Sequence, residues 1–232
     1  PYHRLGASSF LRKAALPLVR QRAYATGAAA TDPVQITTLP NQVRVATEAT
    51  PGHFSAVGVY IDAGSRYERP WVPGESGVSH LLDRMAFKST KGRTAEDMEQ
   101  LIQAVGGNVM CSSSRETIMY QSSVFNQDIR TVLDVFADTI QNPVMDANEL
   151  GVQREATAWE VSEIWSKPEM ILPEIVHAVA YQNNTLGHPL LCPMENLDIV
   201  TTDNLRDFMR AWYRPEPVSY THLRAHETGR NL

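Results

Sequence analysis

The chain has 232 residues, of which 43% are hydrophobic and 20% are charged. This composition is typical of a folded globular protein and is too apolar for a disordered chain. Lysine and arginine number 21 against 26 aspartates and glutamates, which gives a formal net charge of −5. An acidic balance without a basic block argues against nucleic acid as the main partner. No apolar run approaches the roughly 18 residues that span a bilayer, so we expect no integral membrane segment.

Cysteine usage indicates the redox compartment. Cys111 and Cys192 are the two cysteines, and they form no C-x-x-C pair. Their number and spacing argue against a disulfide scaffold and a zinc ribbon and favour a reducing compartment. We expect both to be reduced packing residues.

The first residues differ in charge from the rest. Residues 1–31 contain five basic side chains and no acidic one, together with many alanines and several serines. This composition is typical of a mitochondrial transit peptide, and a basic arm without a targeting role is the alternative. The stretch from Arg22 to Ala25 resembles the site at which matrix presequences are cut. We therefore predict a transit peptide over residues 1–24, cleavage near Tyr24 and Ala25, and a location in the mitochondrial matrix.

Strands and helices alternate in the first part of the body. Alternating apolar residues predict strands, and apolar residues three and four apart predict helices. Thr94, with Asp97 three residues later, indicates the N-cap of one helix, and Gly106-Gly107 indicates its end. In chain order we expect a two-stranded hairpin over 34–48, a strand from 56, helices over 77–87 and 94–107, a strand pair over 109–125 and a helix over 126–143.

The second part is mainly helical. Asp146, followed by Glu149, predicts the start of a long helix. Pro168 begins a further helix, and Thr201 or Thr202 caps the last one. This order of elements predicts an α+β fold, with a mixed, largely antiparallel sheet and helices packed on one face.

Residues 218–232 do not continue this pattern. His222 and His226 lie four positions apart, but the glutamate follows the second histidine, so we expect no metal site there. We interpret this segment as an unrelated tail that arose as a sequence artefact, and we assign the globular domain to residues 25–217.

The segment that bears on chemistry is His80-Leu81-Leu82-Asp83-Arg84. An inverted zinc peptidase site needs H-x-x-E-H on a helix, where the histidines bind the metal and the glutamate activates its water. Asp83 replaces the glutamate and withdraws the carboxylate by one methylene, and Arg84 replaces the second histidine with a permanent cation. We therefore predict no catalytic residue, no bound metal and no cofactor in this chain.

Several long strings resemble the α subunits of mitochondrial processing peptidases, which are non-catalytic relatives of the pitrilysin-like, or inverzincin, peptidases. The strings are GVSHLLDRMAFKST, AVGGN, SSRETIMYQSSVFNQD, EIWSKPEMILPEIVHAVAY and TLGHPLLCP. The resemblance runs from about Val34 to about Pro215. It implies that Glu160 stands at the third zinc-ligand position of the active β subunits. We therefore predict that Arg84 faces Glu160 and supplies the missing positive charge.

The resemblance also implies how the protein works. It implies a subunit of two similar halves, of which this chain contains the first and lacks the second with its glycine-rich loop. It further implies a heterodimer with a catalytic β subunit that holds zinc, and a role in recognising the basic presequences of imported precursors. The alternative is a core subunit of the cytochrome bc1 complex, with a structural role.

The charge of the body agrees with a cationic substrate. Residues 32–232 contain sixteen basic against twenty-six acidic side chains, and opposite charge favours association. An ordinary solvated face is the alternative interpretation of these acidic residues. The candidates for an acidic binding surface are Glu68, Glu75, Asp83, Glu96, Asp97 and Glu99.

Overall fold

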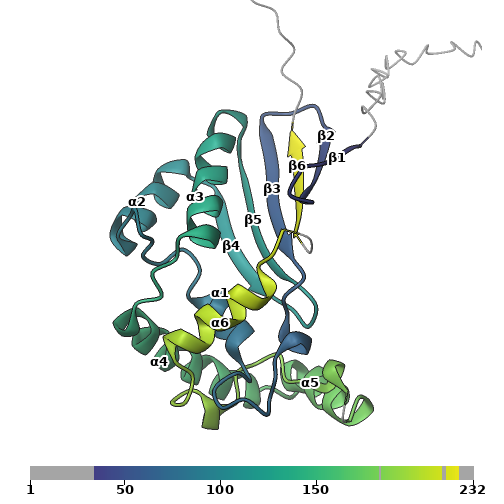
Figure 1. Ribbon diagram of the computed structural model, residues 1–232, viewed down its shortest axis with the longest axis vertical. Helices are drawn as coiled ribbons and strands as arrows, with labels where there is room; N and C mark the ends of the chain where they lie inside the picture. The colour runs from purple at the N-terminus through teal and green to yellow at the C-terminus, as the bar shows by residue number, and fades with distance from the viewer. Residues whose placement is uncertain (1–33, 183, 216–217, 225–232) are drawn as a thin grey trace, which may run out of the picture.

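One mixed sheet of six strands organises the protein (Figure 1). The computed structural model describes residues 34–182 and 184–215, together with the backbone of residues 218–224. The predicted transit peptide and its cleavage position near Tyr24 and Ala25 lie outside these residues. In chain order the strands are β1 Gln35–Thr38, β2 Arg44–Ala49, β3 Phe54–Ile61, β4 Asn108–Ser113, β5 Ile118–Phe125 and β6 Val218–Arg224.

The strands lie in the order β1-β2-β6-β3-β5-β4. Every neighbouring pair is antiparallel except β2 and β6, which are parallel. The predicted α+β fold with a mixed, largely antiparallel sheet is therefore confirmed. The hairpin and the strand pair expected from alternation correspond to β1–β2 and β4–β5.

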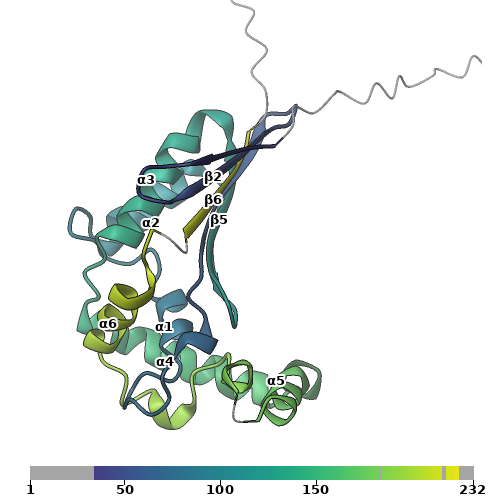
Figure 2. The same ribbon diagram turned by 45° about the vertical axis from the view of Figure 1, so that its right-hand side comes forward.

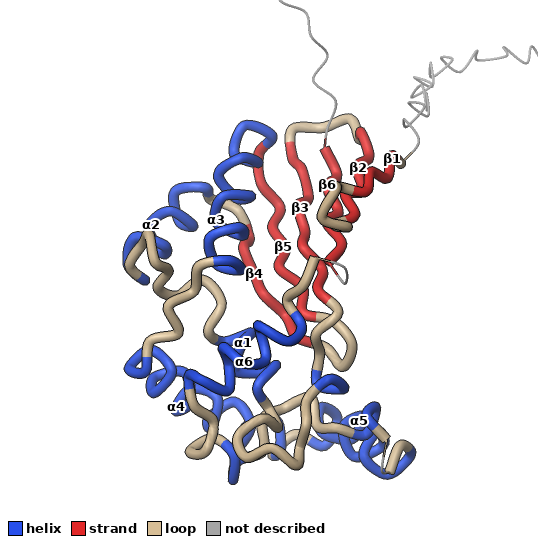
Figure 3. The backbone as a smooth tube through the Cα atoms, in the orientation of Figure 1, coloured by secondary structure: helices blue, strands red, loops and turns tan. Residues whose placement is uncertain are grey.

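The helices lie on one face of the sheet and beyond one of its ends (Figures 2 and 3). The helices α2 and α3 cover the face, and the other four gather at the end, where α5 projects furthest (Figure 1). No helix within the described part of the chain is long and apolar enough to cross a membrane. The bounds are α1 Val78–Arg84, α2 Ala95–Val105, α3 Ile129–Gln141, α4 Ala147–Trp165, α5 Pro168–Ala180 and α6 Thr202–Trp212.

The core lies between the sheet and these helices. Alternate residues of β3, such as Val57, Val59 and Ile61, are almost completely buried, as are Ile118 and the other even-numbered residues of β5. This period of two is what alternation in the sequence predicts, since successive strand side chains point to opposite faces.

Helix caps fix where the helices begin. Thr94 and Asp97 form a reciprocal capping box at α2, as predicted, and Gly106 ends that helix with φ of 65°. Asp146 caps α4 by accepting from the backbone N–H groups of Asn148 and Glu149. The Glu149 side chain does not complete a capping box there, because its carboxylate accepts hydrogen bonds from Ser89 instead.

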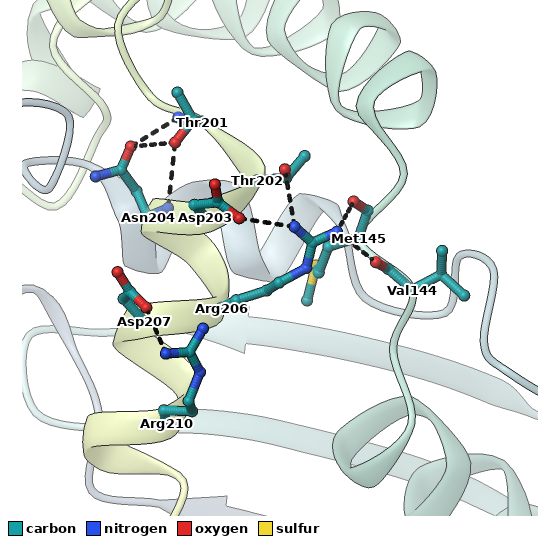
Figure 4. Close-up of polar contacts among 9 residues, drawn as sticks. All are labelled: Val144, Met145, Thr201, Thr202, Asp203, Asn204, Arg206, Asp207 and Arg210. Carbon is teal, nitrogen blue, oxygen red and sulfur yellow. Dashed lines mark hydrogen bonds and ion pairs between the residues drawn. The ribbon is translucent and has the colours of Figure 1, made fainter.

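The last helix is anchored near its start (Figure 4). Thr201, rather than Thr202, caps α6 in a reciprocal pair with Asn204. Arg206 donates to the backbone carbonyls of Val144 and Met145 at 3.0 and 3.1 Å. These bonds tie α6 to the connection between α3 and α4.

The position of β6 differs from the interpretation of residues 218–232 as a tail beyond the domain. Val218–Arg224 pairs with β2 on one side and with β3 on the other, inside the sheet. Strand pairing uses backbone N–H and C=O groups, so it requires no particular side chains. The origin of this segment's sequence stays a prediction, and residues 225–232 lie outside the described part of the chain.

Candidate functional site

The helix α1 carries the degenerate motif, and a carboxylate from outside the helix holds its first turn. Gly77 precedes the helix with φ of 91° and offers no side chain as a cap. Glu68 takes this role, because its carboxylate accepts from the N–H of Gly77 at 2.8 Å and of Ser79 at 2.9 Å. The Ser79 hydroxyl donates to the same carboxylate at 2.6 Å. Burial raises the pKa of Glu68 to about 7, against these three bonds, which favour the charged form.

Cys192 fixes the other side of the helix start. A Cβ atom on Gly77 would lie 2.4 Å from the Cys192 Sγ atom, so only glycine allows this approach. The backbone N–H of Cys192 donates to His80 Nδ1 at 3.1 Å. We therefore assign the proton of the neutral imidazole to Nε2. Burial raises the pKa of the Cys192 thiol to about 12, consistent with a reduced packing residue.

Asp83 faces the sheet. Its Oδ2 atom accepts from the backbone N–H of Ser113 on β4 at 2.8 Å, and burial raises its pKa. The carboxylate thus joins α1 to the edge strand of the sheet. Asp83 makes no hydrogen bond with the neighbouring Arg84 in the described structure, because consecutive helix positions point about 100° apart.

Arg84 and Glu160 face each other, as predicted. The Arg84 Nη2 atom lies 2.6 Å from Glu160 Oε1. The second oxygen, Oε2, lies 3.5 Å from His80 Nε2. The His80 ring and the Arg84 guanidinium lower the pKa of Glu160, against partial burial, which raises it. One carboxylate of α4 therefore meets two residues that lie one turn apart on α1.

These residues do not fit a zinc ion. Zinc in a catalytic site takes three protein ligands with free lone pairs, whereas His80 and Glu160 are the two ligand types present beside Arg84. The described residues include no group of three or more His, Cys, Asp or Glu side chains that could hold a metal. Chemically, the arrangement can hold two helices together through an ion pair.

The expected acidic surface is wrong for Glu68 and Glu75, and Asp83 is half-buried and bound to Ser113 of β4. Glu68 and Glu75 are only 3% exposed; Glu68 caps α1, and Glu75 binds Arg69 at 2.7 Å. The α2 members Glu96, Asp97 and Glu99 are exposed. Sequence reasoning also missed Cys192 and Ser113, whose backbone N–H groups act here without regard to side-chain type.

Comparisons with known proteins identify the family of the chain. Residues 44–194 match the model of the insulinase family, peptidase family M16, which is more than half of the chain. The chain belongs to this family. A crystal structure of a protease from Helicobacter pylori superposes with a TM-score of 0.75 at 22% identity, over 84% of this chain and 47% of that one. At this identity the likeness concerns the fold alone.

Curated relatives give closer matches. The mitochondrial-processing peptidase α subunit of Neurospora crassa is 50% identical over 88% of this chain and 36% of its own length. The mitochondrial-processing peptidase β subunit of Rattus norvegicus is 34% identical over 78% of this chain and 36% of its own length. The predicted resemblance to such α subunits is confirmed. The chain spans about a third of the length of these relatives.

Proposed function

We propose that this chain is the first part of a non-catalytic α-type subunit of a mitochondrial processing peptidase, which recognises basic presequences in the matrix while a zinc-bearing β subunit cleaves them. The observation that carries the proposal is the contact between Arg84 and Glu160 at 2.6 Å. A guanidinium beside the third ligand position leaves no place for the metal that would activate water. The relative that is 50% identical, from Neurospora crassa, is an α subunit, which agrees with the same assignment.

The surface of α5 supports association with further polypeptide. Leu172, Val176 and Val179 on this helix are 59%, 54% and 72% exposed, and Trp159 on the adjoining α4 is 81% exposed. A run of large apolar side chains in contact with water is typical of an interface. The rest of the α subunit and the β subunit are the partners that we propose for it.

The first experiment tests recognition without cleavage. A fluorescent presequence peptide is incubated with the 232-residue chain, with and without added zinc, and its binding and cleavage are followed by anisotropy and mass spectrometry. We expect binding that weakens with salt and no cleavage. A control peptide with its arginines replaced by glutamine should bind at least tenfold more weakly. Zinc-dependent cleavage, or equal binding of both peptides, would contradict the proposal.

The second experiment identifies the partner. The native protein is purified from mitochondria without detergent and its companions are identified by mass spectrometry. We expect a soluble heterodimer with a processing peptidase β subunit. Recovery only from detergent-solubilised respiratory complexes would instead support the role as a cytochrome bc1 core subunit.

A further inference from the structure

The buried polar groups that lack a hydrogen-bond partner at this site are N–H donors, which cannot bind a metal ion. His80 Nε2 and Arg84 Nε are both buried and have no hydrogen-bond partner among the described residues. Arg84 Nε is an N–H donor, as every guanidinium nitrogen is. His80 Nε2 is a donor as well, because the Cys192 N–H occupies the lone pair of Nδ1 and leaves the ring proton on Nε2. A cation requires lone pairs, so these groups oppose a metal ion. The carboxylate of Glu160, by contrast, accepts a hydrogen bond from Arg84 Nη2 at 2.6 Å and lies 3.5 Å from His80 Nε2.

The degenerate site therefore pairs one carboxylate acceptor with two N–H donors. Glu160 offers two oxygens, one to the Arg84 guanidinium at 2.6 Å and one toward His80 Nε2 at 3.5 Å. His80 is 3% exposed, and the Nδ1 atom on the other side of its ring accepts a hydrogen bond from the Cys192 N–H. The donors come from α1 and the acceptor from α4, so the contact joins two helices that are far apart in sequence.

We propose that Arg84 is a built-in cation that joins α1 to α4 in place of a metal ion, and that His80 presents an N–H group toward Glu160 and is not a potential metal ligand. This inference concerns the chain's own residues and stands whether or not the chain recognises presequences. It has a sharp consequence: restoring a histidine at position 84 does not restore a zinc site, because Cys192 keeps the proton on His80 Nε2.

The test compares four variants of the 232-residue chain with the unchanged chain. Arg84→His supplies the missing ligand type, Arg84→Met removes the charge, and Arg84→Lys retains the charge. Arg66→Met is the matched control, because Arg66 pairs with Glu116, which is 60% exposed on the surface. Each protein is dialysed against zinc and then buffer, and zinc content and thermal midpoint are measured.

We expect Arg84→His to retain no more zinc than the unchanged chain, as measured by elemental analysis. Arg84→Met should lower the midpoint by about 3 °C, and Arg84→Lys should recover about half of that shift. One additional equivalent of zinc in Arg84→His would overturn the inference. A midpoint of Arg84→Met equal to that of Arg66→Met would overturn it as well.

A measurement on the unchanged chain guards against variants that fail to fold. The nitrogen-15 chemical shifts of the imidazole ring report which nitrogen carries the proton, and loss of the signals in His80→Gln assigns them. We expect the Nε2–H tautomer for His80. The Nδ1–H tautomer would overturn the proposed role of Cys192 and leave His80 a potential ligand.

Discussion

The helix α1 is held at its two ends by carboxylates that work in opposite ways. Glu68 at the start is 3% exposed and accepts only neutral donors, so burial dominates and raises its pKa to about 7. Glu160 at the end is about one-third exposed and faces a guanidinium, so its pKa is lowered. A carboxylate deep in the protein thus resists ionisation despite three hydrogen bonds, whereas a partly exposed one is kept ionised by a neighbouring cation.

The largest expected effect on stability comes from a substitution at the start of α1 that leaves both carboxylates unchanged. In Gly77→Ala the new Cβ atom would lie 2.4 Å from Cys192 Sγ and 2.6 Å from its Cα, at a φ of 91°. Overpacking and backbone strain together should lower the free energy of unfolding by about 3 kcal/mol or more. Chemical denaturation measures this loss. Gly106→Ala is the control, since a Cβ atom there would meet no atom within 4 Å and only the positive φ is unfavourable.

The next largest effect is the pH dependence of stability that follows from the raised pKa of Glu68. Because the pKa of Glu68 is about 7 in the folded chain and about 4.5 when unfolded, folding retains a proton between these values. The contribution of Glu68 to the free energy of unfolding should therefore be highest below pH 4.5 and should fall, by roughly 3 kcal/mol, as the pH rises through 7.

Glu68→Gln isolates that contribution, because glutamine does not titrate. The difference in unfolding free energy between this variant and the unchanged chain should shift in favour of the variant over pH 4.5 to 8. Denaturation curves at four pH values measure it. A difference that stays constant with pH would show that the donors around Glu68 compensate its burial in full.

The smallest expected effect on stability concerns Glu160, the partly exposed carboxylate at the end of α1. Glu160→Gln should lower the free energy of unfolding by about 0.5–1 kcal/mol in low salt, because the ion pair with Arg84 is partly solvated. In 1 M salt most of this difference should disappear. The contribution of Glu68 should persist in salt, since its partners are uncharged and buried. Equal salt dependence of the two variants would contradict the contrast between the two carboxylates.

The sequence predicted those features whose signals are local or tied to a motif. The capping box of Thr94 and Asp97 depends on residues three apart, and the strands follow from alternation. The contact between Arg84 and Glu160 was predictable because the resemblance assigned both positions to one site. All three depend on the types of side chain and their spacing, which can be read directly from a sequence.

The rest depends on geometry that residue types do not reveal. Glu68 and Glu75 carry charge, so they were expected on the surface, and only the folded chain supplies the donors that allow their burial. The bond between Cys192 N–H and His80 joins residues 112 positions apart through a backbone group that nearly every residue has. The position of β6 likewise depends on backbone pairing, for which polar side chains gave no signal.

That position of β6 has a consequence for the order in which the protein assembles. The strands β2 and β3 are separated by only four residues in sequence, yet they do not pair with each other, because β6 lies between them. The hairpin of β1 and β2 thus joins the sheet through a strand made more than 150 residues later. Contacts of such long range slow folding, and until they form, two open strand edges invite pairing with other chains. During synthesis the sheet stays open until its last strand has left the ribosome.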